Sequence, residues 1–168
     1  MDGIAPVRAQ APVIRNIQRA DLAMSQRHWT EAEGAYRTAL AASRESDYEA
    51  LIKISHCLRI QKRTDESLRY AQLAKQVMPG EAQAHAASGL AALEGGKSAA
   101  ALAEFKAYER VLPGNPGMTF YSGRALEGLG RKKEAAEAFS RYLQVGGTGE
   151  SATYATQRLT DWGMMTQP

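Results

Sequence analysis

Three groups of residues could support chemistry: a glycine-rich segment ahead of a lysine, three histidines and one cysteine. The segment Gly95-Gly96-Lys97-Ser98 resembles the end of a phosphate-binding P-loop, in which backbone N–H groups and a lysine hold the phosphates of a nucleotide. That motif needs a glycine five residues before Gly96, and this position is Ala91. No strand is predicted ahead of the segment. We therefore interpret it as the turn of a helical hairpin, with Ser98 as the N-cap of the second helix.

The titratable residues show no catalytic or metal-binding pattern. His28, His56 and His85 lack the spacing of a helical zinc site, and no His-Glu-x-x-His motif is present. A nucleophilic pair of Cys57 and His56 is not expected, because neighbouring helical residues point about 100° apart. Carboxylates stand beside bases, as in residues 131–134, which is typical of a solvated helix surface. We expect no catalytic, metal-binding or cofactor-binding residues, and hence no enzyme activity in this chain.

Composition favours helices and excludes several classes of partner. The 168 residues are 44% hydrophobic but only 7% aromatic, which suits packed helices better than sheets. The net charge of +3 is small and basic residues are interleaved with acids, so no nucleic acid is expected as a partner. No apolar run approaches the roughly 20 residues that span a bilayer, so no membrane insertion is expected. The segment 1–10 lacks the apolar stretch of a secretory signal.

The chain repeats itself at an offset of 34 residues. The matching pairs share this one offset without a gap: Pro79 with Pro113, Gly89 with Gly123, Gly96 with Gly130, Ala101 with Ala135, Phe105 with Phe139, and Tyr108 with Tyr142. A period of this length is typical of a solenoid built from helical hairpins. The small residue of the first helix lets the second helix approach, and the phenylalanine fills the space between hairpins. A glycine in the left-handed conformation ends the first helix, and a proline stops the second.

These motifs resemble the tetratricopeptide-repeat (TPR) family. Ala101 with Phe105, and Ala135 with Phe139, match the Ala-x3-Phe pattern of its second helix, and proline follows at the expected place. Two weaker copies lie upstream. The resemblance implies an all-α, right-handed solenoid of four helical hairpins plus a C-terminal capping helix, which covers the last apolar face.

We predict a flexible lead-in over 1–12, which contains Pro6 and Pro12, and one TPR domain over 13–163. Its units are about 13–47, 48–81, 82–115 and 116–149, followed by the capping helix 150–162. The nine helices are expected at 13–27, 30–43, 48–61, 65–77, 82–94, 98–112, 117–129, 132–144 and 150–162.

The resemblance also implies where a partner binds, because the first helix of each TPR unit lines the concave face. The residues that the family pattern places there mix apolar anchors with charges: Ile17, Asp21, Met24, Ile52, His56, Arg59, Leu90, Phe120, Arg124, Glu127, Tyr154 and Arg158. This set would suit a peptide or protein segment with apolar and acidic side chains. The predicted function is therefore a protein–protein interaction module. Self-association by stacking of the end repeats is a structural alternative.

A narrower resemblance covers about the second half of the chain. Segment 112–116, Phe120, Gly123, residues 154–159 and Trp162 are similar to the C-terminal TPR region of some bacterial M48-type zinc metallopeptidases of the cell envelope. Those peptidases carry His-Glu-x-x-His in a separate domain. The resemblance implies, as the alternative function, a non-catalytic region that recognises a substrate or partner. It would place the chain in the periplasm or envelope, whereas a true start at Met1 would indicate the cytoplasm.

Overall fold

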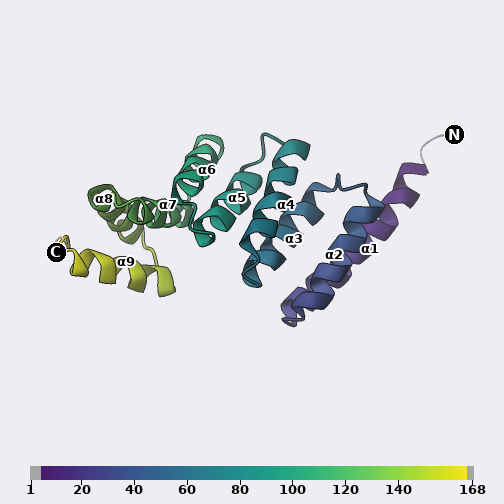
Figure 1. Cartoon of the computed structure of the whole chain (residues 1–168), viewed down its shortest axis with the longest axis horizontal. Helices are drawn as coiled ribbons and strands as arrows, with labels where there is room; N and C mark the ends of the chain where they lie inside the picture. The colour runs from purple at the N-terminus through teal and green to yellow at the C-terminus, as the bar shows by residue number, and fades with distance from the viewer. Residues whose placement is uncertain (1–4, 166–168) are drawn as a thin grey trace.

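The computed structural model describes residues 5–165, with side chains from Gln10 onward, and in this range it contains nine α-helices and no strand. The helices are α1 (Ala5–Ser25), α2 (Trp29–Ala42), α3 (Tyr48–Ile60), α4 (Thr64–Val77), α5 (Ala82–Glu94), α6 (Ser98–Val111), α7 (Pro116–Gly128), α8 (Lys132–Gln144) and α9 (Gly149–Asp161). Figure 1 shows them in sequence order along one elongated molecule, with α1 and α9 at opposite ends. This arrangement confirms the predicted all-α solenoid.

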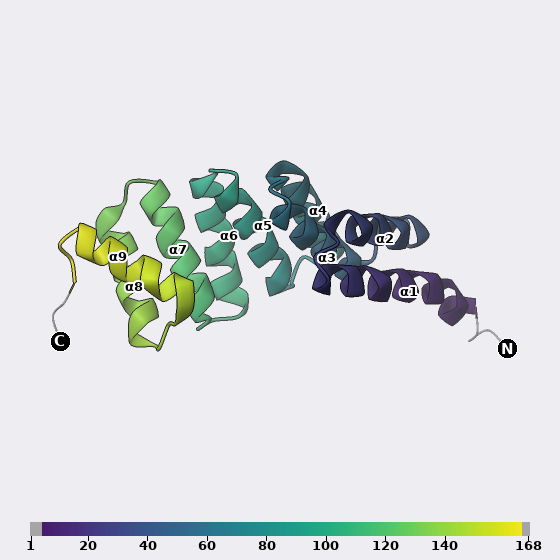
Figure 2. The same cartoon turned by 90° about the horizontal axis from the view of Figure 1, so that it is seen from below.

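Consecutive helices pack in pairs, and the pairs pack on one another. α1 contacts α2, α3 contacts α4, α5 contacts α6 and α7 contacts α8, while α3 also contacts α5 and α5 contacts α7. The first helices of the pairs therefore form one face of the solenoid, which we call the first-helix face. Figure 2 shows the row from a second direction, with α9 lying across the end of the last pair.

Each downstream pair is held close by a glycine facing a phenylalanine ring. A Cβ built on Gly89 would lie 2.4 Å from Cε1 of Phe105, and one on Gly123 would lie 2.7 Å from Cε1 of Phe139. Both rings are buried. The predicted role of the two glycines is confirmed, because no side chain fits between these helices and the rings they face.

The turn within each pair places one residue in the left-handed conformation. Gly96 and Gly130 both have φ of +73°, as predicted, but in the upstream pairs Arg27 and Lys62 take the same conformation with φ of 61° and 62°. The next backbone N–H then bonds back to a carbonyl five residues earlier. In the third pair this bond joins Lys97 N to the carbonyl O of Ala92 at 2.8 Å. The turn geometry is thus common to all four pairs, although only two of them use glycine.

The predicted N-cap of α6 is wrong by one residue. The carbonyl of Lys97 accepts the first intrahelical bond, from Ala101 N at 3.0 Å, which makes Lys97 the N-cap. Ser98 is the first residue of the helix, and its Oγ lies where a side chain on Gly128 would have to go. The small hydroxyl therefore packs against the next pair and does not cap its own helix.

The predicted lead-in also needs correction. α1 begins at Ala5 and includes Pro12 in its interior, whereas we expected the helix to start at Val13. Proline is tolerated in the first turn, where its missing N–H would have no partner, so Pro6 does not stop the helix. The amide of Asn16 donates to the Pro12 carbonyl at 2.8 Å. Residues 1–4 of the predicted lead-in lie outside the described residues.

Helix α9 closes the apolar end of the solenoid. Its Ala155 and Leu159 are buried, and Trp162, just after the helix, stacks on Phe139 with ring centroids 6.1 Å apart. The helix lies within one residue of the predicted capping helix at each end. It covers the face that the α7–α8 pair would otherwise expose to water.

Candidate functional site: a groove on the first-helix face

A groove of about 530 Å3 lies across α1, α3 and α5 on the first-helix face. This volume falls within the range of about 300–1,000 Å3 that is usual for ligand pockets. Twelve residues from four helices line it: Asp21, Met24, Tyr36, Ile52, Lys53, Ser55, His56, Arg59, Gln83, Ala86, Ala87 and Leu90.

Half of the residues predicted to face a partner meet in this groove. They are Asp21 and Met24 of α1, Ile52, His56 and Arg59 of α3, and Leu90 of α5. They lie on neighbouring turns because they occupy equivalent positions of the repeat, which stacked pairs bring side by side. The structure thus joins residues up to about two repeats apart in the sequence into one surface.

Two of the predicted residues lie in the core instead. Ile17 is 6% exposed and Phe120 is 4% exposed. The Phe120 ring contacts the rings of Tyr142 and Tyr154, with centroids 5.2 Å and 5.9 Å away. The prediction that Ile17 and Phe120 face a partner is therefore wrong. Register alone placed them on the first-helix face, but the neighbouring side chains bury them.

The remaining four predicted residues form a separate cluster on α7 and α9. Tyr154 donates its hydroxyl to Oε2 of Glu127 at 2.6 Å, and Nε of Arg158 lies 2.9 Å from Oε1 of the same carboxylate. The guanidinium carbons of Arg124 and Arg158 lie 4.9 Å and 5.2 Å from the centre of the Tyr154 ring. Both cations thus interact with this ring. The cluster ties α9 to α7 and lies outside the groove.

Charges at the groove are paired with one another. Asp21 accepts the Tyr36 hydroxyl at 2.6 Å and pairs with Nζ of Lys53, while Arg59 pairs with Glu94 of α5. Desolvation alone would lower the pKa of Lys53, but hydrogen bonds to Asp21 and Glu49 outweigh it and raise this pKa. The paired charges fix the side chains at two edges of the groove and leave its middle apolar.

His56 adds no positive charge to the groove at neutral pH. Desolvation lowers its pKa, the charge of Arg59 lowers it further, and Glu94 acts in the opposite direction. The ordinary pKa of histidine is already near 6.5, so the ring is neutral at pH 7. Its Nδ1 lies 3.3 Å from a guanidinium nitrogen of Arg59.

The structure adds six lining residues to those in the predicted set: Tyr36, Lys53, Ser55, Gln83, Ala86 and Ala87. Lys53 and Ser55 lie next to the predicted Ile52 and His56 on α3, and the three α5 residues share their helix with Leu90. The exception is Tyr36, which belongs to a second helix and reaches the groove through its hydroxyl. Its position in the Ala-x3-Phe pattern was the only sequence signal for it.

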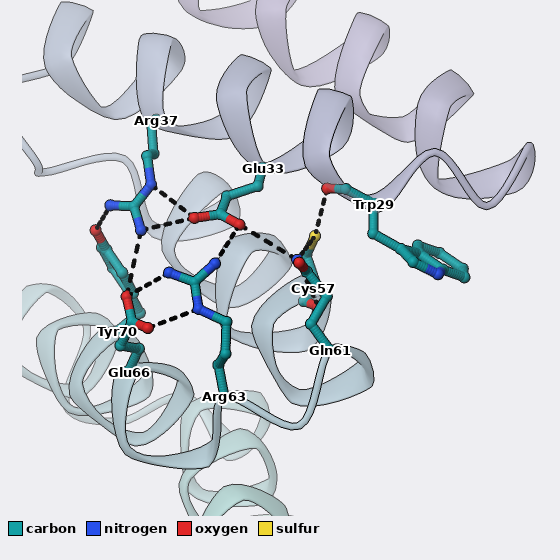
Figure 3. Close-up of polar contacts among 8 residues, drawn as sticks. All are labelled: Trp29, Glu33, Arg37, Cys57, Gln61, Arg63, Glu66 and Tyr70. Atoms are coloured by element: carbon teal, nitrogen blue, oxygen red, sulfur yellow. Dashed lines mark hydrogen bonds and ion pairs between the residues drawn. The ribbon is translucent and has the colours of Figure 1, made fainter.

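A second polar cluster lies away from the groove, between α2 and the start of α4 (Figure 3). Glu33 accepts hydrogen bonds from Arg37 at 2.8 Å, from Arg63 at 2.5 Å and from Gln61 at 3.3 Å. Gln61 also lies 3.4 Å from the sulfur of Cys57. Burial raises the pKa of this thiol, which disfavours the reactive thiolate. The cluster therefore joins the first two helix pairs and is not a nucleophilic site.

Residues with possible metal or nucleotide chemistry do not assemble in the described part of the chain. Within it, no three His, Cys, Asp or Glu side chains gather as a metal site would require. Lys97 of the P-loop-like segment pairs with Asp65 at 2.7 Å, on the surface. Over the same residues, none of the helices is long and apolar enough to cross a membrane.

The repeat geometry and the sequence agree on the family. The sequence pattern of the tetratricopeptide repeat matches residues 17–82, 65–116 and 86–152. The chain belongs to the tetratricopeptide-repeat family. This TPR fold supports, in general, a module for protein–protein interaction.

Solved TPR structures show the same fold at low sequence identity. MamA (residues 41 to its end) from Desulfovibrio magneticus RS-1 superposes with a TM-score of 0.79 at 12% identity, over 91% of this chain and 86% of that one. The TPR protein TTC0263 of Thermus thermophilus gives 0.73 at 17% identity, over 93% and 84%. YrrB, described as a TPR protein with an unusual peptide-binding site, gives 0.72 at 18% identity, over 82% and 71%. A comparison with curated protein sequences gives no match.

Proposed function

We propose that this TPR chain is an interaction module that holds a peptide or protein segment in the groove formed by α1, α3 and α5. The observation that carries the proposal is the groove itself, where six residues placed by the repeat pattern converge around an apolar centre. The function proposed is non-covalent binding without a catalytic step. One solved TPR relative, YrrB, is described as having a peptide-binding site, which supports a ligand of the same kind here.

The bound segment would place apolar side chains among Met24, Ile52 and Leu90. These three are partly exposed and belong to three different helices, so a segment lying across the helices would touch all of them. Burying such side chains removes apolar surface from water, which is the main favourable term in binding. An acidic side chain of the partner would meet Arg124, an exposed residue of α7 that occupies the repeat position of Leu90.

The proposal is tested by capture of partners from an extract of the source cells. The immobilised wild-type chain and a Leu90→Glu variant are compared by quantitative mass spectrometry. A charge placed in the apolar centre of the groove should reduce capture of groove partners by about tenfold or more, because an unpaired carboxylate would be buried on binding. The matched control is Leu22→Glu, which changes an apolar residue of α1 that is 59% exposed and lies outside the groove.

Charge changes at two groove residues and at Arg124, beyond the groove on α7, provide a second test. His56→Glu, Arg59→Glu and Arg124→Glu are combined in one chain whose circular dichroism must remain helical. If every protein captured by the wild type is captured equally by this chain and by Leu90→Glu, the assignment of the groove is wrong. Loss of capture with Leu22→Glu alone would show that partners bind the outer side of α1 and not the groove.

A further inference from the structure

The third and fourth helix pairs carry aromatic rings at positions where the second and third pairs carry alanines. The 34-residue offset pairs Phe105 with Ala71, and it pairs the neighbouring residues Phe120 and Tyr121 with Ala86 and Ala87. The Phe105 and Tyr121 rings, which meet between the third and fourth helix pairs, thus correspond to two methyl groups, those of Ala71 and Ala87, between the second and third. Phe120 faces Tyr142 of its own pair and Tyr154 of α9.

Downstream, aromatic rings pack against one another on the first-helix side of the junction. Phe105 stacks on Tyr121 with centroids 6.1 Å apart, and Tyr121 meets Phe120 edge-on at 5.4 Å. The Phe105 ring also presses on Gly89, the small residue of its own pair. Aromatic pairs at such distances bury large areas and hold a defined geometry.

Upstream, the same volume stays open. Ser55 stands at the repeat position of Gly89, and Ser55, Ala86 and Ala87 all line the groove. Ala71 is fully buried and supplies only a methyl group. Ala86 and Ala87 thus line the groove at positions that carry the Phe120 and Tyr121 rings one repeat later, and here they supply only methyl groups.

We propose that the partner of this chain inserts an aromatic side chain, phenylalanine, tyrosine or tryptophan, into the groove between Ser55 and Ala87. This inference rests on the proposed function and specifies the partner's anchor. The partner's ring would take the position that a ring of the chain itself occupies one repeat later. The helices on either side have the spacing of the same 34-residue repeat.

The surroundings of the open volume suit a ring better than an aliphatic chain. Met24 offers a thioether, which makes favourable contacts with aromatic rings. Arg59, held in place by Glu94, offers a guanidinium at the edge, and cations stabilise ring faces. The neutral ring of His56 adds a further flat surface. An isobutyl or isopropyl group would use neither the sulfur nor the cation in this way.

The test uses a phage-displayed library of random 12-residue peptides, selected on the full chain. Selected peptides are added to protein carrying 13C-methyl methionine, and only those that shift the Met24 methyl signal are kept as groove binders. In these peptides we expect one aromatic position in common. Replacing it by leucine should weaken binding by about 3- to 30-fold, because leucine keeps most of the apolar burial but loses the sulfur–ring and cation–ring contacts.

Two variants of the protein fill the groove from within. Ala87→Tyr restores the residue found at Tyr121, and Ala86→Phe restores the one found at Phe120. Each should weaken the selected peptides by about tenfold or more, because the internal ring takes the place of the peptide's ring. Ala103→Tyr is the matched control, since Ala103 is an exposed residue of α6 outside the groove, and it should leave the affinity unchanged.

The outcomes separate this inference from the proposed function. Peptides that shift Met24 but tolerate leucine in place of every aromatic residue would overturn the aromatic anchor and leave the interaction module standing. A library that yields binders, none of which shifts Met24, would overturn the groove as the binding site, and the inference with it. Because the leucine replacement is made in the peptide, it decides the matter even if both groove-filling variants fail to fold.

Discussion

The ring of Phe105 lies where a side chain on Gly89 would have to stand, with only 2.4 Å between Cε1 and a Cβ built on that glycine. The third helix pair can therefore close only because position 89 has no side chain. The same relationship recurs between Phe139 and Gly123, so it is a property of the repeat unit.

The first prediction is that Gly89→Ala destabilises the protein although alanine is the better helix former. Overpacking a buried site costs about 1–3 kcal/mol, and a contact this short belongs at the upper end because Phe105 is buried on all sides. Alanine gains only about 1 kcal/mol over glycine in a helix. The melting temperature and the urea midpoint should both fall.

The matched control is the same substitution on α2. A Cβ at Gly34 would meet nothing within 4 Å, so the added methyl group causes no overpacking. Gly34→Ala should therefore stabilise the protein by about 0.5–1 kcal/mol. Equal effects of the two substitutions would show that the glycine–phenylalanine contact does not control the packing.

The second prediction concerns the left-handed turn residues. Lys62 has a positive φ of 62°, a conformation that is unfavourable by about 1–2 kcal/mol for residues with a Cβ. Lys62→Gly should raise the free energy of unfolding by up to about 1 kcal/mol, since glycine's greater freedom when unfolded offsets part of the gain. Gly130→Ala, at the same position of a downstream turn, should lower it by about 1 kcal/mol. Thermal unfolding of both variants measures the two changes in stability. A loss of stability in Lys62→Gly would contradict the prediction.

Sequence spacing predicted the architecture because the residues that end the helices of the repeat do so for physical reasons. Pro79 and Pro113 follow residues forced toward extended backbone, and both second helices end there, at Val77 and Val111. The start of α1 was missed because Pro6 and Pro12 were read as breakers. A proline in the first turn loses no hydrogen bond, and the composition of the segment does not reveal that its helix continues past Pro12.

The helix face that carries the groove could be predicted from the sequence, but the exposure of the individual residues on that face could not. Register identified which positions share a face, and it placed Ile52 and Phe120 alike. Exposure depends on the volume of the neighbours, so Phe120 is buried under Tyr154 while Ile52 lines the groove. The missing rings at Ala71 and Ala87 were visible in the sequence. The effect of these missing rings on the groove was not visible, because it required knowing that positions 71 and 87 meet in one junction.

The third prediction is a pH dependence of stability through Glu33. Burial alone would raise the pKa of this carboxyl, but hydrogen bonds from Arg37, Arg63 and Gln61 outweigh burial and lower the pKa below its ordinary value of 4.5. A lowered pKa in the folded state means that Glu33 stabilises the protein above pH 4.5 and that this contribution is lost as the pH falls through the folded pKa.

Glu33→Gln isolates this contribution. At pH 7 the variant should be less stable by about 1–3 kcal/mol, the usual worth of hydrogen bonds to charged groups. The difference from the wild type should shrink as the pH is lowered from about 5 toward about 2, as measured by urea unfolding at each pH. Glu31→Gln, on the same helix with 46% of its side chain exposed, should change stability by less. A difference that stays constant over this acid range would contradict the role assigned to the Glu33 charge.

The fourth prediction tests whether the second helix pair can be returned to the pattern of the third. Ser55 and Ser67 there exchange hydrogen bonds, with each hydroxyl donating to the other residue's carbonyl at 2.9 Å and 2.8 Å. Ser55→Gly breaks this exchange and weakens the helix, and Ala71→Phe forces a ring against the Ser55 side chain. Each change alone should therefore destabilise the protein.

Together the two changes recreate the pairing of Gly89 with Phe105. The double variant should be more stable than the sum of the single effects allows, with a coupling of at least about 1 kcal/mol, as expected for residues in contact. The new ring would also enter the junction that the groove occupies, so binding of groove peptides should weaken by about tenfold or more. Urea unfolding of the four-protein cycle and peptide titration of the double variant measure the two effects. If the effects simply add while peptide binding is unchanged, the groove does not owe its volume to the missing ring at position 71.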